Sequence, residues 1–263
     1  MAPTNILTLT TDFGMSDGYV GIVKGVALGI NPELKLIDIT HEIPSWNIAA
    51  AAWVIWNAHR FFPEATVHLC VVDPAVGSKS QRGIALTNGS AFFVGPDNGI
   101  FSLIADWGNG GRCHELANDQ YWRPDVSSTF HTRDIYGPVC AHLAKGVPIE
   151  SFGPAVRVET LKRIALPRFA EVGGGAEGSI VYIDKFGNLI TNIPASAVHP
   201  GQRCFLGKVY IASITSTYSS AEPGKPAAFI GSHGYLEIGV YQGRAEKSCG
   251  ASVGDSLRLE PLE

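Results

Sequence analysis

The sequence contains no block of basic residues, no close cysteine pair and no long apolar run. Its 263 residues carry a formal net charge of -4, which argues against a nucleic-acid surface because such surfaces cluster Lys and Arg. The five cysteines are scattered without a CxxC spacing, so no disulfide framework is expected. The longest apolar stretch, residues 48–56, is much shorter than the roughly 18 residues of a membrane span. No signal-peptide pattern is visible at the start, and we expect a cytoplasmic protein without membrane or nucleic-acid partners.

Common catalytic signatures are missing as well. The chain has no GxSxG, no P-loop and no convincing GxGxxG, which leaves serine-hydrolase, nucleotide triphosphatase and dinucleotide mechanisms unsupported. It has no HxxxH, HxH or DxD pair, although metal sites usually show at least one close ligand pair. Scattered acids and a histidine could still hold Mn²⁺ or Zn²⁺, so a metal-dependent phosphohydrolase is kept as a second possibility. Our main expectation is no metal and no cofactor.

The first half of the chain alternates between strand and helix patterns, which predicts an α/β domain with a mostly parallel central sheet. A hairpin is expected where Asn88-Gly89 separates two apolar runs. Pro138 is expected to start or kink a helix over 134–146. The predicted strands are 5–13, 34–40 and 66–73, the hairpin is 83–97, and the predicted helices are 18–31, 47–62, 99–108 and 134–146.

The pattern changes after residue 165. Proline, charge and a Gly triplet indicate a linker at 166–177 between a domain at 1–165 and a second domain at 178–263. The second domain shows short β-rich segments separated by Gly-containing turns and no convincing helix. We therefore predict a small all-β, barrel-like domain there.

Two aspartates follow predicted strands of the first domain. Asp12 ends the first strand and Asp73 ends the third, so both should lie at one edge of a parallel sheet, where α/β proteins bind ligands. A carboxylate such as Asp12 can accept hydrogen bonds from both hydroxyls of a ribose. Asp73 is followed by Pro74, which is equally typical of a simple turn.

His131 lies just before a predicted helix. The positive end of a helix disfavours imidazolium, so this histidine should be neutral and able to accept a proton or orient a water. The competing interpretation is a histidine packed at a helix start. In the second domain, Asp184 and Asn188 flank a turn, and Ser232 lies in a Gly-rich turn whose N–H groups could hold a carboxylate. Plain hairpins would explain both stretches.

Six segments, in this order along the chain, resemble one family. The sequence is similar to the S-adenosyl-L-methionine hydroxide adenosyltransferases, also called adenosine-forming S-adenosylmethionine hydrolases, which are related to fluorinase and chlorinase. The resemblance covers about residues 5 to 260. The segments that carry it are "LTTDFGMSDGYVG", "ITHEIPSWNI", "VVDPAVGS", "FVGPDNGIFS", "TFHTRDIYGPVCAHLAKG" and "IDKFGNLITNI".

The resemblance implies an N-terminal α/β domain, a C-terminal β-barrel and a homotrimer with the substrate between subunits. It implies a catalytic trio of Asp73, an arginine and His131 around the attacking water, with Arg82 as the arginine available here. It also implies that the substrate is bound by Asp12 at the ribose, Trp46, Phe130 and Thr132 along the ligand, Asp184 at the methionine ammonium, Asn188 at the adenine and Ser232 at the methionine carboxylate.

The sequence departs from the family pattern at three places. The family arginine usually stands seven residues after the aspartate, where this chain has Ser80, and Arg82 is two residues further on. Thr132 replaces a frequent glycine. Tyr241 and Arg244 stand where asparagines are common.

The implied reaction is attack of an oriented water or hydroxide on C5′ of S-adenosyl-L-methionine, giving adenosine and L-methionine without a metal. A sulfonium is already an activated leaving group, so the problem is one of positioning the water. The relatives that use a halide replace the aspartate and the histidine, and a carboxylate at Asp73 would repel an anion. Two further functions stay possible from the sequence, a halide-using transferase and a non-catalytic binder of adenosine or S-adenosylmethionine.

Overall fold

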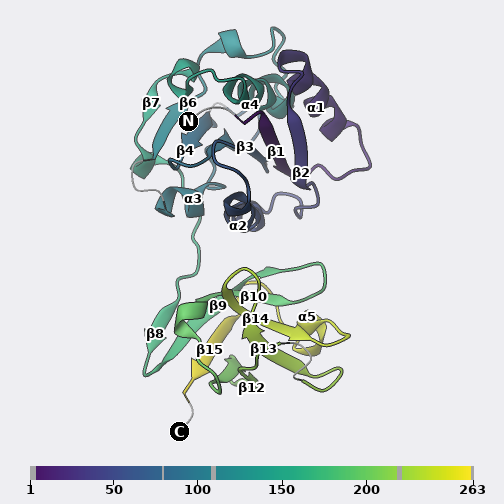
Figure 1. Cartoon of the computed structure of the whole chain (residues 1–263), viewed down its shortest axis with the longest axis vertical. Coiled ribbons are helices and arrows are strands. Elements are labelled where there is room, and N and C mark those ends of the chain that lie inside the picture. Colours follow the sequence, from purple (N-terminus) through teal and green to yellow (C-terminus); the bar gives the residue numbers. More distant parts are fainter. Residues whose placement is uncertain (1–3, 79, 108–110, 218–220, 262–263) are drawn as a thin grey trace. The chain divides into compact units, whose positions relative to one another are not determined.

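The computed structural model divides the chain into two compact units, which we describe separately. Unit 1 runs to Ile164 and unit 2 starts at Ala165. The structure describes residues 4–78, 80–107, 111–217 and 221–261. Unit 1 mixes helices and strands, whereas unit 2 is built almost entirely of strands (Figure 1). Over the described ranges, no helix has the length and apolar character needed to cross a bilayer.

Unit 1 contains a seven-stranded sheet of order β2-β1-β3-β5-β4-β6-β7. The pairs β1–β2, β1–β3 and β3–β5 are parallel, and the other three neighbouring pairs are antiparallel, so the sheet is mixed. The strands are β1 (Ile6–Thr11), β2 (Lys35–Thr40), β3 (Val67–Val71), β4 (Gly83–Thr87), β5 (Phe92–Pro96), β6 (Arg112–Glu115) and β7 (Ala155–Val156).

The antiparallel half of this sheet begins with the expected hairpin. β4 turns back into β5 at Asn88-Gly89, where Gly89 has a φ of +95° and the Asn88 side chain accepts N–H groups of Ser90 and Ala91. The hairpin prediction is therefore confirmed. Because β5 pairs in parallel with β3, the hairpin places β4, and after it β6 and β7, on the side of β5 away from β3.

Helices cover both faces of the sheet (Figure 1). Helices α1 and α4 pack together on one face, where Val23, Val139 and Cys140 share a core with Leu7 and Leu69 of the strands. Helices α2 and α3 lie on the opposite face. The helices are α1 (Tyr19–Ile30), α2 (Ile48–Ala58), α3 (Ser102–Trp107) and α4 (Gly137–Ala144), with short 3₁₀ turns at His59–Phe61, Asp119–Tyr121, Ile149–Phe152 and Val158–Thr160.

A π-helical turn, Thr132–Tyr136, leads directly into α4. The N–H of Gly137 bonds to the carbonyl of Thr132, which is the wide spacing of a π-turn. Pro138 follows in the first turn of α4, where the helical path changes from π to α, as expected for a proline that starts or kinks a helix. Such π-turns are often found at functional sites.

Unit 2 is a nearly closed antiparallel sheet of order β12-β11-β15-β9-β10-β14-β13, with β8 paired to β9. A bridge between Ile214 and Ala228 joins the two ends of this order. The barrel-like domain is thus confirmed. The strands are β8 (Ala170–Val172), β9 (Gly175–Ile183), β10 (Leu189–Pro194), β11 (Arg203–Leu206), β12 (Val209–Ser213), β13 (Pro226–Ile230), β14 (Tyr235–Val240) and β15 (Ser256–Glu260), with a 3₁₀ turn at Ala195–Ala197 and the short helix α5 (Ala245–Ser248).

Part of the segment expected to be a linker is regular structure. Residues 170–172 form β8, and Gly173 and Gly174, both with positive φ, turn the chain into β9. The Gly triplet therefore makes a hairpin turn, because glycine adopts the left-handed backbone that the turn requires.

A substitution at Gly95 in β5 can test how tightly the parallel strands β3 and β5 of the unit 1 sheet are packed. A Cβ at this position would lie 2.1 Å from the carbonyl oxygen of Cys70 in β3. We expect Gly95→Ala to lower the free energy of unfolding by about 1–3 kcal/mol, because two backbones must separate. The matched control is Gly25→Ala in α1, where nothing lies within 4 Å of the added Cβ. That control should raise stability by about 0.5–1 kcal/mol in urea unfolding followed by circular dichroism. Equal effects of the two substitutions would contradict this account.

Candidate active site

The edge of the sheet at the carboxyl ends of β1 and β3 is a topological switch point. The chain leaves β1 through α1 to reach β2 on one side and then returns through α2 to β3 on the other side. Thr11 pairs with Val71, so Asp12 and Asp73 follow neighbouring strand ends. Ligands of open α/β sheets bind in the crevice that opens at such a point. The prediction that both aspartates share one edge is confirmed.

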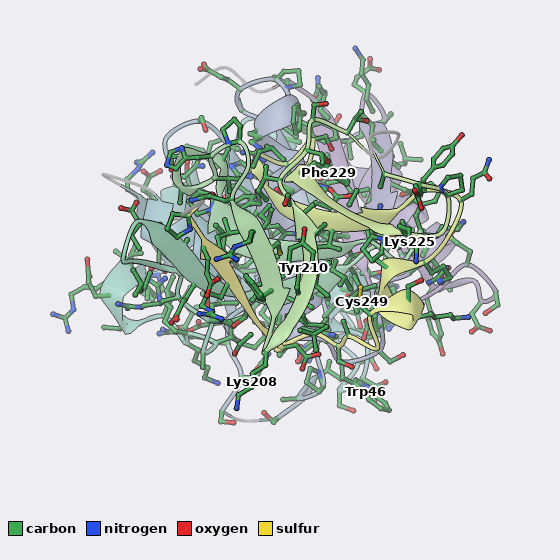
Figure 2. The ribbon with its side chains drawn as sticks, turned by 90° about the horizontal axis from the view of Figure 1, so that it is seen from below. Trp46, Lys208, Tyr210, Lys225, Phe229 and Cys249 are labelled. Atoms are coloured by element: carbon green, nitrogen blue, oxygen red, sulfur yellow. The ribbon has the colours of Figure 1, made fainter. Side chains whose placement is uncertain are left out.

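Asp12 organises the loop between β2 and α2. Its Oδ2 accepts the backbone N–H of Trp46 at 2.9 Å. Trp46 has a φ of +65°, unusual for a residue with a side chain; the residue is 72% exposed and its side chain projects from the loop (Figure 2). The structure therefore brings together two predicted site residues, one anionic and one aromatic.

Asp73 uses only one of its two carboxylate oxygens within the protein. Oδ1 accepts the N–H of Ala75 at 3.1 Å and the side-chain amide of Gln81 at 3.0 Å. Oδ2 is buried and has no hydrogen-bond partner among the described residues. A buried acceptor without a partner is costly in a stable fold, and it is a common feature of sites that bind a polar ligand.

The surroundings of Asp73 favour its protonated form. Burial raises the pKa of this carboxyl, hydrogen bonds from Ala75 and Gln81 and the charge of His131 lower it, and the charge of Asp12 raises it further; the net pKa is above the usual range. Burial, followed by the charge of Asp73, also raises the pKa of Tyr136. Asp73 is thus coupled electrostatically to Asp12, His131 and Tyr136.

His131 is the residue that precedes the π-turn, as expected for a histidine at a helix start. Its ring meets that of Tyr136 edge-to-face at 6.4 Å. The Asp73 loop reaches the same segment, because a Cβ at Gly77 would lie 2.1 Å from the carbonyl oxygen of Ser128. The absence of a side chain at Gly77 therefore allows the two loops to approach closely.

The neighbours of His131 have different environments. The ring of Phe130 packs edge-to-face against two other rings, with centroids 6.0 Å from Phe13 and 5.3 Å from Tyr19. Phe13 is the residue directly after Asp12. Thr132 is buried at the start of the π-turn. The structure thus brings Phe130 to the edge that carries Asp12, whereas Thr132 is part of the packed interior.

Arg82 does not pair with Asp73. Its Nε lies 2.9 Å from Oδ2 of Asp97, a carboxylate that is only 4% exposed and that also accepts the N–H of Lys162. Gln81 is the residue that reaches Asp73. Reasoning from the sequence missed both Gln81 and Asp97, although Asp97 directly follows the carboxyl end of β5 and could have been found by that signal.

A cavity of about 780 Å³ opens beside these groups in unit 1. Its walls combine polar groups with the aromatic rings of Trp122 and Tyr136. They include Gln81, Arg82, Asp97, His131 and Tyr136. Throughout the described part of the chain, no group of three His, Cys, Asp or Glu side chains could hold a metal ion.

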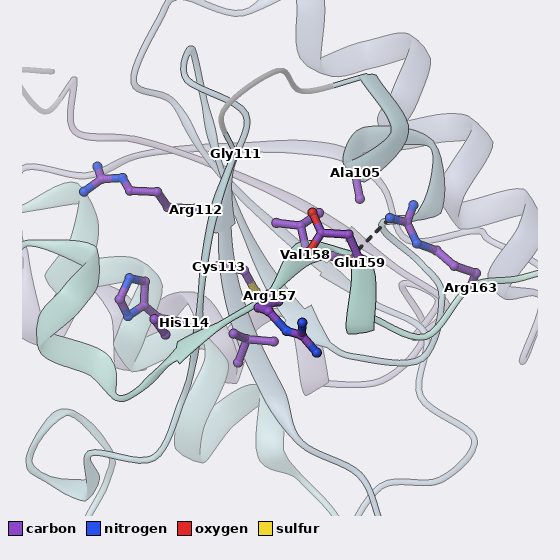
Figure 3. A pocket seen from close by; sticks show the side chains of 11 residues that line it. Ala105, Gly111, Arg112, Cys113, His114, Arg157, Val158, Glu159 and Arg163 are labelled. Carbon is purple, nitrogen blue, oxygen red and sulfur yellow. Dashed lines mark hydrogen bonds between the residues drawn. The ribbon is translucent and has the colours of Figure 1, made fainter.

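A second cavity of unit 1, of about 500 Å³, lies beside β6 and β7 (Figure 3). Three arginines line it, but Arg163 pairs with Asp106 and Arg112 pairs with Glu150. Figure 3 shows the Arg163 guanidinium turned toward the backbone of Val158, to which it donates at 3.4 Å. None of the site residues predicted from the sequence is among its described lining residues.

In unit 2, Asp184 and Asn188 close the hairpin between β9 and β10. Asp184 accepts the N–H groups of Phe186 and Asn188 through Oδ1 and the Asn188 amide through Oδ2, each at 2.9 Å. Arg244 clasps the same turn by donating to the carbonyl of Lys185. Both predicted residues are therefore together, and the hairpin interpretation of this stretch is also correct.

A cavity of about 710 Å³ opens beside this hairpin. Phe186, which is 73% exposed, forms part of its wall together with Asn188, Tyr241 and Arg244. The two positions of unit 2 that depart from the family pattern, Tyr241 and Arg244, thus both line it. An exposed ring beside amide and guanidinium groups suits a flat heterocycle.

Ser232 lies elsewhere in unit 2. It is exposed in the turn between β13 and β14, which is closed by the N–H of Gly234 bonding to Gly231. β14 pairs with β10 so that Pro194 faces Tyr235 and Leu189 faces Ile238. The Ser232 turn and Asn188 are therefore at opposite ends of β10, and the structure does not bring them together.

Comparison with known proteins places this architecture in one family. Residues 7–153 match the N-terminal domain of the SAM hydroxide adenosyltransferases, and residues 178–258 match their C-terminal domain. The chain belongs to this family, as the six ordered segments of the sequence indicated.

Individual relatives agree over nearly the whole chain. A protein of Salinispora tropica named (R)-S-adenosyl-L-methionine hydrolase is 37% identical over 260 residues, covering 98% of this chain and 99% of the relative. A fluorinase of an Actinoplanes species is 28% identical, covering 89% and 90%. A crystal structure of an uncharacterized conserved protein from Thermotoga maritima superposes with a TM-score of 0.91 at 32% identity, covering 97% of this chain and 100% of that one.

The raised pKa of Asp73 predicts that the difference in stability between Asp73→Asn and the wild type depends on pH. Because its pKa is raised in the folded state, ionised Asp73 destabilises the fold above that pKa, and the effect vanishes below the unfolded value of about 3.9. Asp73→Asn should therefore raise the midpoint of thermal unfolding by a few degrees at pH 8 and by nothing at pH 3.5. The measurement is a set of melting curves across this range. Asp125→Asn, outside the site, serves as the control. A constant difference at all pH values would contradict this interpretation.

Proposed function

We propose that the protein hydrolyses S-adenosyl-L-methionine to adenosine and L-methionine. The observation that carries the proposal is the Asp73 carboxylate at the switch point of a chain from this family, because its Oδ2 is buried without a partner among the described residues and its pKa responds to the charge of His131. Relatives named (R)-S-adenosyl-L-methionine hydrolase at 32% to 37% identity over the full chain support the same reaction.

In the proposed reaction, Asp73 positions a water molecule through Oδ2. The water oxygen attacks C5′ in line with the sulfur, the C5′–S bond breaks, and its electron pair stays on the thioether of methionine. The proton released by the water passes to Asp73 and then to solvent. Because the sulfonium leaves without protonation, no general acid is needed, and positioning supplies much of the rate. His131 shares the water's second hydrogen bond.

Arg82 contributes from the cavity wall. Asp97 holds its guanidinium in place, so we propose that Arg82 fixes the shape of this wall and does not orient Asp73 directly. We propose that the reaction requires neither a metal nor a cofactor, since the substrate already carries its leaving group.

The substrate is proposed to contact both kinds of site described above. Asp12 accepts the ribose hydroxyls, while the exposed ring of Trp46 and the cluster around Phe130 line the sugar and the sulfonium. The cavity of unit 2 takes the adenine beside Asn188, and Asp184 attracts the methionine ammonium. Thr132 and Ser232 are omitted from this set because of where the structure places them.

The first test is product analysis of the purified protein supplied with S-adenosyl-L-methionine. We expect adenosine and L-methionine in equal amounts, unchanged turnover in EDTA, and adenosine rather than the 5′-chloro product when chloride is added. Asp73→Ala should lower kcat by about 10²–10⁴-fold, the usual contribution of a positioned proton acceptor.

Asp125→Ala, an exposed aspartate outside the site, is the matched control and should keep wild-type kcat. Wild-type protein that releases no adenosine would refute the proposal, and loss of activity in EDTA would favour a metal-dependent reaction. Tight binding without turnover would favour a binding protein instead.

We also propose that the chain forms a homotrimer, in which unit 1 of one subunit and unit 2 of the next act on the same substrate molecule. The water-positioning residues lie in unit 1, whereas the cavity with the exposed ring lies in unit 2, and the family resemblance supports shared sites. The cytoplasm is the proposed compartment, because the cysteines are free thiols.

Light scattering should give three times the chain mass of 28.0 kDa. Co-refolding of Asp73→Ala with a second inactive variant altered in unit 2, such as Asn188→Ala, should restore part of the activity, because some shared sites then receive two intact halves. A monomeric mass, or no recovery from two variants that are inactive alone, would contradict the shared site.

A further inference from the structure

Gln81 occupies the place beside Asp73 where the family resemblance implies an arginine. The residue seven positions after the aspartate is Ser80, which is exposed, and the side-chain amide of Gln81 donates to Oδ1 of Asp73 at 3.0 Å. Ala75 holds the same oxygen through its N–H. Two neutral donors on Oδ1 leave Oδ2 as the oxygen available to a ligand.

Arg82 is prevented from taking over this contact. Its side chain is paired with Asp97, and its carbonyl oxygen accepts the N–H of the same residue at 2.9 Å. Asp97 is buried, so moving the guanidinium to Asp73 would leave a buried carboxylate without its cation. The Arg82 guanidinium is therefore held by Asp97, and the other described cation near this loop, the Lys162 ammonium, donates to the carbonyl of Ser80 at 3.2 Å.

A neutral donor and a cation have different effects on a proton acceptor. An arginine beside an aspartate lowers the carboxyl pKa by about 1–3 units and weakens it as a base, whereas an amide orients the carboxylate with a smaller effect. Among the described residues, the ionisable groups coupled electrostatically to Asp73 are Asp12 at the end of β1 and His131 and Tyr136 on the π-turn segment. None of these three is a permanent cation.

We propose that Gln81 is the positioning residue of Asp73, which it orients by an uncharged hydrogen bond in place of an arginine so that Asp73 stays an effective proton acceptor. This inference rests on the proposed hydrolysis and names a residue that the family pattern does not predict. In the step concerned, the water O–C5′ bond forms, the C5′–S bond breaks with its electrons going to sulfur, and one water proton moves to Oδ2 of Asp73.

The test is the pH profile of kcat for Gln81→Leu and Gln81→Arg. Activity should fall as the pH drops through the pKa of Asp73. Gln81→Leu removes a hydrogen bond from the ionised form, so its acidic limb should move to higher pH, with kcat at least about 10-fold lower and KM within twofold. Gln81→Arg adds a cation, so its acidic limb should move to lower pH by about 1–3 units.

Gln120 provides matched controls, because it is an exposed glutamine of the same unit. Gln120→Leu and Gln120→Arg should keep the wild-type profile. The proposal is supported if the acidic limb moves to higher pH in Gln81→Leu and to lower pH in Gln81→Arg. A purely structural role would not give shifts in opposite directions. Unchanged profiles, or shifts in the same direction, would overturn it.

A second measurement separates this inference from the proposed reaction. The stability gain of Asp73→Asn at pH 8 should shrink in the Gln81→Arg background and grow in the Gln81→Leu background, whether or not the protein turns over. Wild-type protein that makes no adenosine but shows this pattern would refute the hydrolysis and keep the Gln81 contact. If the wild type forms adenosine but the stability gain of Asp73→Asn is the same in the wild-type, Gln81→Arg and Gln81→Leu backgrounds, only the role of Gln81 is refuted.

Discussion

The hydrogen bond from Gln81 to Asp73 is the interaction on which the site depends. Asp73 follows a parallel strand whose whole length is buried, so its carboxylate enters a region with little water. An ionised carboxylate is unfavourable there, and hydrogen bonds from two neutral donors to one of its oxygens offset part of the desolvation free energy. The other oxygen is left for a partner that the described part of the protein does not itself supply.

Three close contacts limit the motion of the loop that carries Asp73. Gly77 lets the Asp73 loop touch the segment before His131, and Gly83 lets the start of β4 lie against the ring of Tyr136. Asn98 extends from the end of β5 to donate to the carbonyl of Val72. The loop therefore meets three neighbouring segments, which reduces the freedom of a carboxylate that must point in one direction.

The sequence by itself determined the parallel half of the unit 1 sheet and the edge that its strands share, but not β6, β7, β8 or α5. Apolar periodicity predicted β1, α1 and β3, and the rule that parallel strands end at one edge placed Asp12 beside Asp73. It could not determine how far the sheet stays parallel, because strand order depends on where the β4–β5 hairpin docks. The fold class and the family were therefore accessible without coordinates.

Only the tertiary structure decided which side chain meets which. Gln81 and Arg82 are adjacent in the chain, but only Gln81 contacts Asp73. Arg82 instead pairs with Asp97, which lies 15 residues further along the chain. In the same way, Thr132 was buried by the π-turn and Ser232 was separated from Asn188 by the length of β10. Partner choice depends on distances through space, which local sequence patterns do not encode.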